Sequence, residues 1–446
     1  MRSLYRKYAL VVAGLLVANF CHPCSAQFGF QQRSVGGVAI DVDGVLSAPT
    51  VQDEQDLSAI RKQARVAVPA ELEQFTELRA VSLRQLEAEI AKAQADKTPL
   101  AESVLFLAGL QRVEYVIVYP ERNDIVLAGP AEGWKIDKLG NLVGSTTNRP
   151  VLLLDDLLIA LRSGPASRVE SITCSIDPTP EGLQRWQAMA RSMRNIGDPE
   201  QTMRRIEEAL GPQTISVTGI SSNTHFARAM VAADFRMKRL AMNFEPAPVG
   251  GMPSFLEMLK AGSAGASSMM PRWWLAPNYQ PLGQTADGLT WQLRGPGVQC
   301  MTEQDFIDAS GKKLHSGKAH PIAQKWADSM TAKFGELATH DSAFGQLRNV
   351  MDLAVIGALI EKHQLFEQAG LETPYLMANL EPAHFPTPRQ TSSKASFVKK
   401  GKKWLISASG GVEILPWEIA DVSETVESIG KVRDSLATTT GQLSWE

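Results

Sequence analysis

The chain has 446 residues, of which 44% are hydrophobic and 21% are charged, and its formal net charge is −3. This composition is that of an ordinary globular protein, and the length suggests two domains or one large domain with additions. A mildly acidic chain lacks the basic surface that neutralises phosphates, so nucleic acid is excluded as the expected partner.

The first 26 residues follow the order of a cleavable secretory signal peptide. Three basic residues open the segment, an uncharged and mostly apolar run covers residues 9–20, and small residues end it at Ala26. The apolar run is shorter than the roughly 20 residues of a membrane-spanning helix, although an N-terminal membrane anchor is the alternative. We therefore expect a periplasmic or extracellular protein. Cleavage removes three cations and no acids, which changes the net charge to −6 (−3 minus 3).

Cleavage also removes two of the four cysteines and leaves Cys174 and Cys300, both in segments typical of strands. An oxidising compartment permits a disulfide between these two residues. The alternative is two separate buried thiols, because a bridge needs Cα atoms within bridging distance, which no sequence pattern establishes.

In chain order, GGVAIDVDGVL (36–46) first predicts a strand, a turn and a strand. Apolar residues at helical spacing from Asp53 to Ala95 predict two helices, which Pro69 separates. The next expected elements are a helix and the two strands of a hairpin, at 99–111, 113–119 and 125–129. The first hairpin strand is apolar enough to be buried on both faces.

Strands and helices alternate in the middle of the chain. The expected elements are strands in SRVESITCSI and QTISVTGI and helices over 185–193, 199–210 and 224–242. Residues 246–271, rich in Pro, Gly, Ser and Met, predict a mobile loop. Two long helices follow at about 321–340 and 343–366, and FVKKGKKWLIS (397–407) predicts a hairpin.

This order predicts an α+β fold of mixed layers, with helices packed on a mixed sheet, a C-terminal helical pair and a C-terminal β-hairpin. The predicted regions are a signal peptide (1–26), an N-terminal tail with short strands (27–56), and a region of N-terminal helices and a β-hairpin (57–165). A main α+β domain (166–380) and a C-terminal hairpin and tail (381–446) follow.

The sequence contains no G-x-S-x-G, P-loop, H-E-x-x-H or G-x-G-x-x-G motif in a strand–helix setting. His315 and His320 share a polar loop but lack the paired spacing of a zinc site. We therefore expect neither a metal nor a cofactor. The pair Asp155-Asp156 serves either acid–base or metal chemistry or, alternatively, supplies the negative charge at a helix start. His225 is typical of a capping or packing residue. His340-Asp341-Ser342 holds triad residue types, but in consecutive positions.

The candidate binding surface combines charges of one predicted helix with the loop that follows it and two tryptophans. Its members are Arg228, Asp234, Arg236, Lys238, Arg239, Trp273 and Trp274. Arg and Trp are enriched at binding hot spots, and a Gly/Ser loop beside aromatic rings can close over a ligand. The alternative is structural, because Asp234 and Lys238 form an i,i+4 pair and adjacent Trp residues in a strand point to opposite faces.

Four segments, CSIDPTPEGL (174–183), ADFRMKRL (233–240), RWWLAPNY (272–279) and LRNVMDLAV (347–355), resemble an uncharacterised family of exported planctomycete proteins, known as a domain of unknown function. The resemblance implies export and one shared architecture. The family has no established activity, cofactor or catalytic residue, so the resemblance assigns no role to any residue of this chain.

We therefore expect an exported, non-catalytic protein that binds or scaffolds an unknown component of the bacterial envelope, with no transmembrane segment in the mature chain. The lysine-rich hairpin (397–407) is either a solvated turn or a contact for an anionic polymer. The alternative function is an exported hydrolase, for which a cleft near Trp273 should gather a carboxylate or a histidine with a perturbed pKa.

Overall fold

The structure is a computed structural model of the whole chain. It describes residues 34–35, 38–41, 43–49, 68–193, 198–261, 270–307, 313–315, 317–396 and 408–438. The predicted signal peptide, the first predicted helix before Pro69, residues 262–269 of the predicted mobile loop and the lysine-rich hairpin lie outside the described residues. The fold is α+β, with 45% helix and 23% strand, as the sequence predicted.

A mixed ten-stranded sheet forms one half of the molecule. Its strands, in spatial order, are β1 (Ser34–Val35), β2 (Val38–Ile40), β3 (Val45–Ser47), β16 (Gln390–Thr391), β10 (Gln213–Thr218), β9 (Ile172–Pro178), β17 (Ser409–Ile414), β11 (Met270–Asn278), β14 (Gly297–Ile307) and β15 (Lys313–His315). Every second residue of β9 is buried, because successive side chains of a strand point to opposite faces. The predicted strand–turn–strand at 36–46 is confirmed by the antiparallel pair β2–β3.

A six-stranded sheet forms the other half and takes strands from distant parts of the chain. In spatial order these are β18 (Ser423–Thr425), β12 (Leu282–Gln284), β13 (Thr290–Gln292), β5 (Tyr115–Tyr119), β6 (Asp124–Ala131) and β4 (Thr76–Ser82). The predicted hairpin is β5–β6, and β5 is central and buried as expected. A separate ribbon pairs β7 (Trp134–Ile136) with β8 (Leu142–Gly144).

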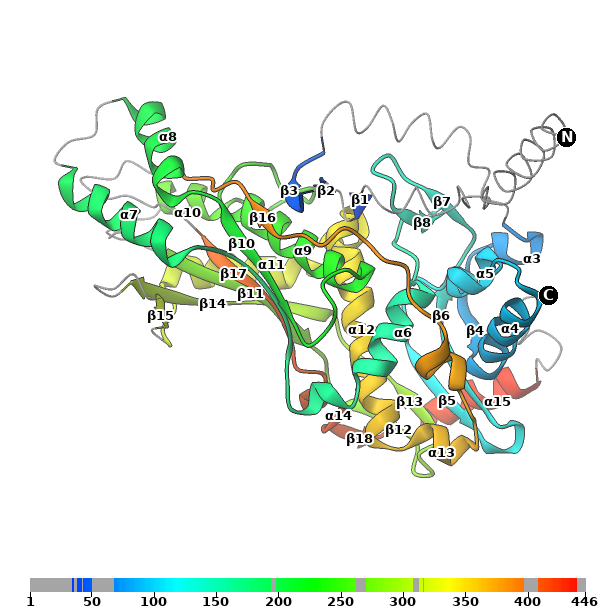
Figure 1. The fold of residues 1–446 in the computed structure, drawn as a ribbon. Helices are drawn as coiled ribbons and strands as arrows, with labels where there is room; N and C mark the ends of the chain where they lie inside the picture. The colour runs from blue at the N-terminus through cyan, green and yellow to red at the C-terminus, as the bar shows by residue number, and fades with distance from the viewer. Residues whose placement is uncertain are drawn as a thin grey trace, which may run out of the picture.

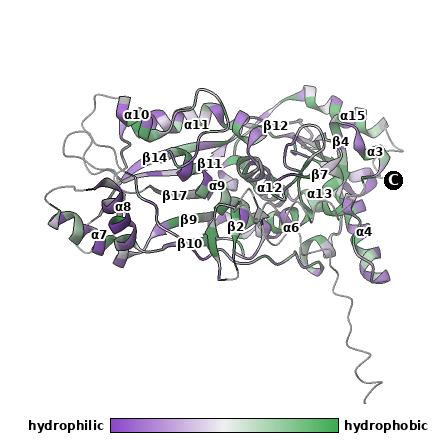
Figure 2. Ribbon diagram, turned by 90° about the horizontal axis from the view of Figure 1, so that it is seen from above, coloured by the Kyte–Doolittle hydropathy of each residue, from purple (hydrophilic) through white to green (hydrophobic). Residues whose placement is uncertain are grey.

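A buried helix, α12 (Ser342–Lys362), stands between the two sheets in both views (Figure 1 and Figure 2). The helices α6 (Leu154–Ser163), α9 (His225–Ala241) and α11 (Pro321–His340) pack against it. The predicted C-terminal pair of long helices is thus confirmed as α11 and α12.

By length and composition alone, α12 is apolar enough to cross a membrane. However, 94% of its most apolar 18-residue window is buried inside the protein. The apolar side chains of α12 are therefore part of the hydrophobic core between the two sheets.

Smaller helices cover the rest of the fold. They are α3 (Ala70–Glu73), α4 (Leu83–Asp96), α5 (Glu102–Leu105), α7 (Pro180–Ser192), α8 (Pro199–Leu210), α10 (Phe255–Ala261), α13 (Leu365–Ala369), α14 (Pro416–Ala420) and α15 (Gly430–Thr438), with the single turns η2 (Leu107–Gly109), η3 (Pro120–Arg122), η4 (Ala166–Arg168), η5 (Tyr375–Asn379) and η6 (Glu427–Ile429).

Two helix predictions are wrong in part. Residues 76–82 lie within the predicted second helix but form β4, because they pair with β6 and tertiary pairing overrides local propensity. The predicted helix over 99–111 is shortened to α5 and η2, since Leu107 and Ala108 have φ of 45° and 53° and end the helical backbone.

A strap of extended chain, residues 381–396, crosses the face of the molecule from η5 to α8 (Figure 1, orange). The backbone N–H of Phe385 donates to Asn223 O at 2.7 Å, and that of Arg389 donates to Gly44 O at 2.7 Å. Near its end, Ala395 N–H donates to Glu207 Oε1 at 3.1 Å. The strap thus ties the start of α9, the β2–β3 turn and α8 together.

Candidate functional site

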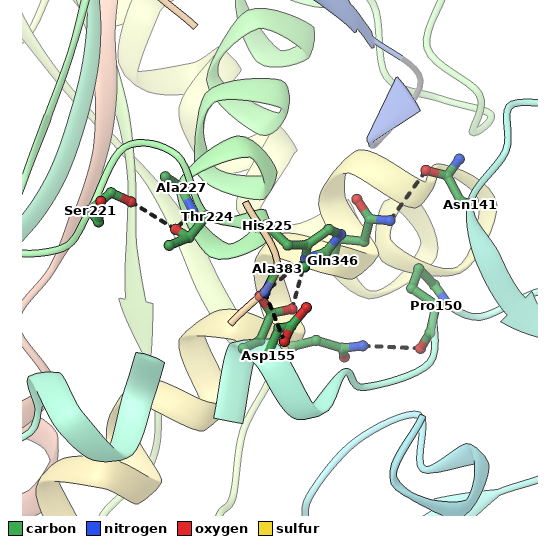
Figure 3. A network of polar contacts seen from close by, with 11 residues as sticks. Asn141, Pro150, Asp155, Ser221, Thr224, His225, Ala227, Gln346 and Ala383 are labelled. Atoms are coloured by element: carbon green, nitrogen blue, oxygen red, sulfur yellow. Dashed lines mark hydrogen bonds and ion pairs between the residues drawn. The ribbon is translucent and has the colours of Figure 1, made fainter. Parts of the chain in front are cut away.

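A histidine–carboxylate pair lies where the first turns of α6 and α9 meet (Figure 3). The α9 helix begins at His225 because Thr224 Oγ1 accepts the Ala227 N–H at 3.2 Å, which satisfies one free donor of the first turn. His225 Nδ1 lies 2.8 Å from Asp156 Oδ2, and both side chains are buried. The carboxylate orients the imidazole, as in sites where histidine works as a base.

A second carboxylate, Asp155, precedes this pair and lies under the strap. Its Oδ1 accepts the Ala383 N–H at 3.3 Å. Burial, followed by the negative charge of Asp156, raises the pKa of Asp155 to about 6. The first turn of α6 tolerates two acids because its N–H groups carry partial positive charge.

The ring of Phe385, a residue of the strap, covers the cluster that Asp155, Asp156 and His225 form. Its centre lies 5.8 Å from the His225 ring and 5.1 Å from the guanidinium carbon of Arg228. Phe385 is 4% exposed and Arg228 is fully buried. Burial lowers the pKa of Arg228 to about 10. These residues thus form a buried polar cluster under an aromatic ring, which we call the polar junction.

Two amides of α12 complete the junction. Gln346 Nε2 donates to Asn141 Oδ1 at 3.2 Å, and Asn349 Nδ2 donates to Pro150 O at 3.0 Å. The buried oxygens Gln346 Oε1 and Asn349 Oδ1 have no hydrogen-bond partner within the described part of the chain. A buried acceptor without a partner costs about 1–3 kcal/mol.

The predicted binding residues lie in several different environments. Arg228, Asp234 and Lys238 lie on the buried face of α9. Lys238 Nζ donates to Asp234 Oδ2 at 2.9 Å and to Ile176 O of β9 at 2.7 Å. The i,i+4 pairing considered for these two residues is confirmed, and it anchors α9 on the ten-stranded sheet.

The two tryptophans point to opposite faces of β11. Trp273 is fully buried, and its ring packs edge-on against Phe255 and Trp326, with ring centres 5.0 Å apart in each case. Trp274 is half-buried, with the Arg272 guanidinium 4.7 Å from its ring centre. The Trp273 ring is therefore part of the packed core, and it lines none of the three cavities described below.

Arg236 and Arg239 lie on the outer side of α9 and do form a shared site. Arg236 Nε lies 2.7 Å from Asp341 Oδ2, and both guanidinium groups contact the Glu245 carboxylate. A cavity of about 360 Å³ opens beside them, and Phe235 and His340 also line it. Of the seven residues predicted for binding, these two line a cavity together.

Cys174 and Cys300 are two separate buried thiols in the structure, which is one of the two alternatives that the sequence left open. Cys174 of β9 pairs with Val412 of β17, Val412 pairs with Leu275 of β11, and Leu275 pairs with Cys300 of β14. Three strand spacings separate the two cysteines by about 14 Å. A disulfide needs Cα atoms within roughly 7 Å.

The remaining histidine candidates act as helix caps or lie apart. His320 Nδ1 accepts the Ile322 N–H at 3.2 Å and caps α11, whereas the side chain of His315 lies outside the described ones. Asp341 caps α12 by accepting the Ala343 N–H at 3.1 Å, so His340-Asp341-Ser342 forms no triad. Among the described residues, no group of three or more His, Cys, Asp and Glu side chains could hold a metal ion.

The contact between His225 and Asp156 is the feature that sequence reasoning missed. Both residues stood out separately, each at the start of a predicted helix. They are 69 positions apart, so only the packing of α6 against α9 brings them together.

Taken together, the fold and its sites define an α+β protein with an interior polar junction and an outer cavity on α9. Residues 174–255, from β9 to the start of α10, match the family described as "Protein of unknown function (DUF1598)". No curated protein and no solved structure matches the chain. The matched segment contains His225, Arg236 and Arg239, and its description states no activity.

Proposed function

We propose that the mature chain is an exported, non-catalytic binding protein, and that its ligand site lies on both sides of the α9–α10 connection, residues 242–254. One observation carries the proposal: two cavities, of about 360 and 650 Å³, flank this connection and share Glu245. Both volumes fall in the range of small-molecule sites, roughly 300–1,000 Å³.

The two cavities differ in character. The smaller one carries two arginines and three carboxylates, which are Arg236, Arg239, Asp137, Glu245 and Asp341. The larger one is lined mainly by apolar side chains, which are Leu240, Pro246, Ala247, Val249, Met252, Pro253, Met258 and Trp326. Methionine adapts its shape to different apolar ligands. An amphipathic ligand, with a polar end at the arginines and an apolar chain along the methionines, fits both.

Export and an envelope ligand are parts of the same proposal. The basic, apolar and small-residue order of residues 1–26 supports export. Amphipathic molecules are abundant at a membrane, so an envelope component meets the chemical requirements of the two cavities.

The test is affinity capture with the mature chain, residues 27–446, as bait in a detergent extract of native envelope, followed by mass spectrometry of the retained molecules. Met258→Glu places a charge in the apolar cavity and should abolish retention. Met301→Glu is the matched control, because Met301 is 39% exposed on β14 and lines neither cavity. Equal retention by both variants would contradict the proposal.

A second candidate, an exported hydrolase, is favoured by the 2.8 Å contact between His225 Nδ1 and Asp156 Oδ2. In that case His225 acts as a general base on water once the strap has moved Phe385 away. Hydrolysis of p-nitrophenyl acetate that falls to the uncatalysed rate in His225→Ala, with an unchanged melting temperature, would favour this candidate. Equal rates for the two proteins would reject it.

A further inference from the structure

A third cavity, of about 630 Å³, lies on a different part of the surface and is polar. It opens between the C-terminal end of α12, the turn η4 and the helix α14. These segments are distant in the sequence, and α14 packs directly against α12. We infer that this groove, which we call the α12–α14 groove, binds a saccharide.

One wall of the groove is an anchored aromatic ring. The Trp417 indole N–H donates to Gly164 O at 2.9 Å, which fixes the ring against the end of α6. The ring is half-buried, so part of it faces the groove. The guanidinium carbon of Arg168 lies 5.2 Å from the ring centre. A ring held in place loses little conformational freedom when a ligand stacks on it.

The second wall is held by an ion pair. Lys362 Nζ lies 2.8 Å from Asp421 Oδ1 and also donates to Ala420 O at 2.8 Å. This pair joins the end of α12 to the end of α14 and neutralises both side chains. The groove therefore has one wall anchored by the Trp417 hydrogen bond and a second wall linked by this ion pair.

Exposed polar side chains surround the ring. Glu361, Gln364, Glu418 and Arg168 are all exposed, and all four line the groove. Carboxylates and the Gln364 amide oxygen accept hydrogen bonds, while the amide nitrogen and the guanidinium donate them. Such a set recognises hydroxyl groups, each of which both donates and accepts.

The groove carries charges of both signs, which do not select a simple ion of one charge. With Lys362 and Asp421 paired, one cation and two carboxylates remain. The carboxylates of Glu361 and Glu418 repel a bound anion, and the guanidinium of Arg168 repels a bound cation. An apolar ligand finds only Leu415 and Trp417 among the nine lining residues. A neutral, hydroxyl-rich molecule with a C–H face for the aromatic ring satisfies all of these conditions, and a saccharide is such a molecule.

The experiment is a glycan array with the mature protein, followed by calorimetric titration of chitotriose, cellotriose and maltotriose. We expect binding of at least one neutral saccharide, and Trp417→Ala should weaken it about 30-fold or more, as for an aromatic hot-spot side chain. Glu418→Ala and Arg168→Ala change only exposed groups and should each weaken binding while the protein stays folded.

The chain offers a matched control in Trp274→Ala, since Trp274 also lies under an arginine but on β11, outside the groove. The control should bind as the unmodified protein does. An array without any bound glycan, or binding that Trp417→Ala and Glu418→Ala leave unchanged, would overturn the inference. Met258→Glu should leave saccharide binding intact, so this result is independent of the site between α9 and α10.

Discussion

Asp155→Asn tests the electrostatics of the junction under the strap. Burial and the neighbouring Asp156 raise the pKa of Asp155 from 3.8 to about 6. Its folded-state pKa is therefore higher than its unfolded-state pKa, so the folded protein binds this proton more tightly. The stability that the proton contributes is fully present below pH 3.8 and is lost as the pH rises through 6.

The magnitude follows from the size of this shift. About two pKa units correspond to about 3 kcal/mol of unfolding free energy at neutral pH, at 1.36 kcal/mol per unit. The amide that Asp155→Asn introduces carries no charge to desolvate, and its oxygen can still accept the Ala383 N–H. We therefore expect the variant to be more stable than the unmodified protein by up to about 3 kcal/mol at pH 7.5.

Urea unfolding at pH 7.5 and at pH 4 measures this difference directly. The increase in unfolding free energy of Asp155→Asn should be present at pH 7.5. It should shrink strongly at pH 4, where Asp155 is protonated in the folded protein. Asp156→Asn is the matched control, because it weakens the contact with His225 and should destabilise the protein at pH 7.5. A variant at position 155 that is no more stable than the unmodified protein at pH 7.5 would refute the reasoning.

Three further predictions concern the core. Asp234→Ala leaves the Lys238 charge buried and should cost about 3–5 kcal/mol in urea unfolding, whereas the double change Asp234→Leu with Lys238→Met should recover most of it. Gly357→Ala places a Cβ 2.3 Å from a carbonyl oxygen of α6 and should cost about 1–3 kcal/mol, while Gly250→Ala, with open space around it, should change little. The mature protein should show two free thiols after unfolding without reductant, and a reductant should leave its melting temperature unchanged.

Much of the local structure was predictable from residue patterns. The helices α7, α8, α9, α11 and α12 and the strands β5, β6, β9 and β10 lie where periodicity and turn residues predicted them. The opposite orientations of Trp273 and Trp274 follow from the two-residue period of a strand. Residues 76–82 show the limit of prediction from local patterns. Their apolar spacing also suits a helix, and only the pairing with β6 makes them a strand.

The candidate sites depended on contacts between distant segments. The starts of α6 and α9 were expected, yet the meeting of His225 with Asp156 requires that both helices pack against α12. The α12–α14 groove combines residues near positions 168, 362 and 417, and no local pattern links them. Pocket formation depends on how elements pack, which a single-sequence pattern does not encode.

The sequence by itself determined the α+β class and the positions of several long helices and central strands, because periodicity and composition act within one element. The tertiary structure decided which strands are neighbours. It placed β17 and β11 between the strands of Cys174 and Cys300, which separates the two thiols. It also decided which charges are buried and which line cavities, because both depend on segments that pack across the whole chain.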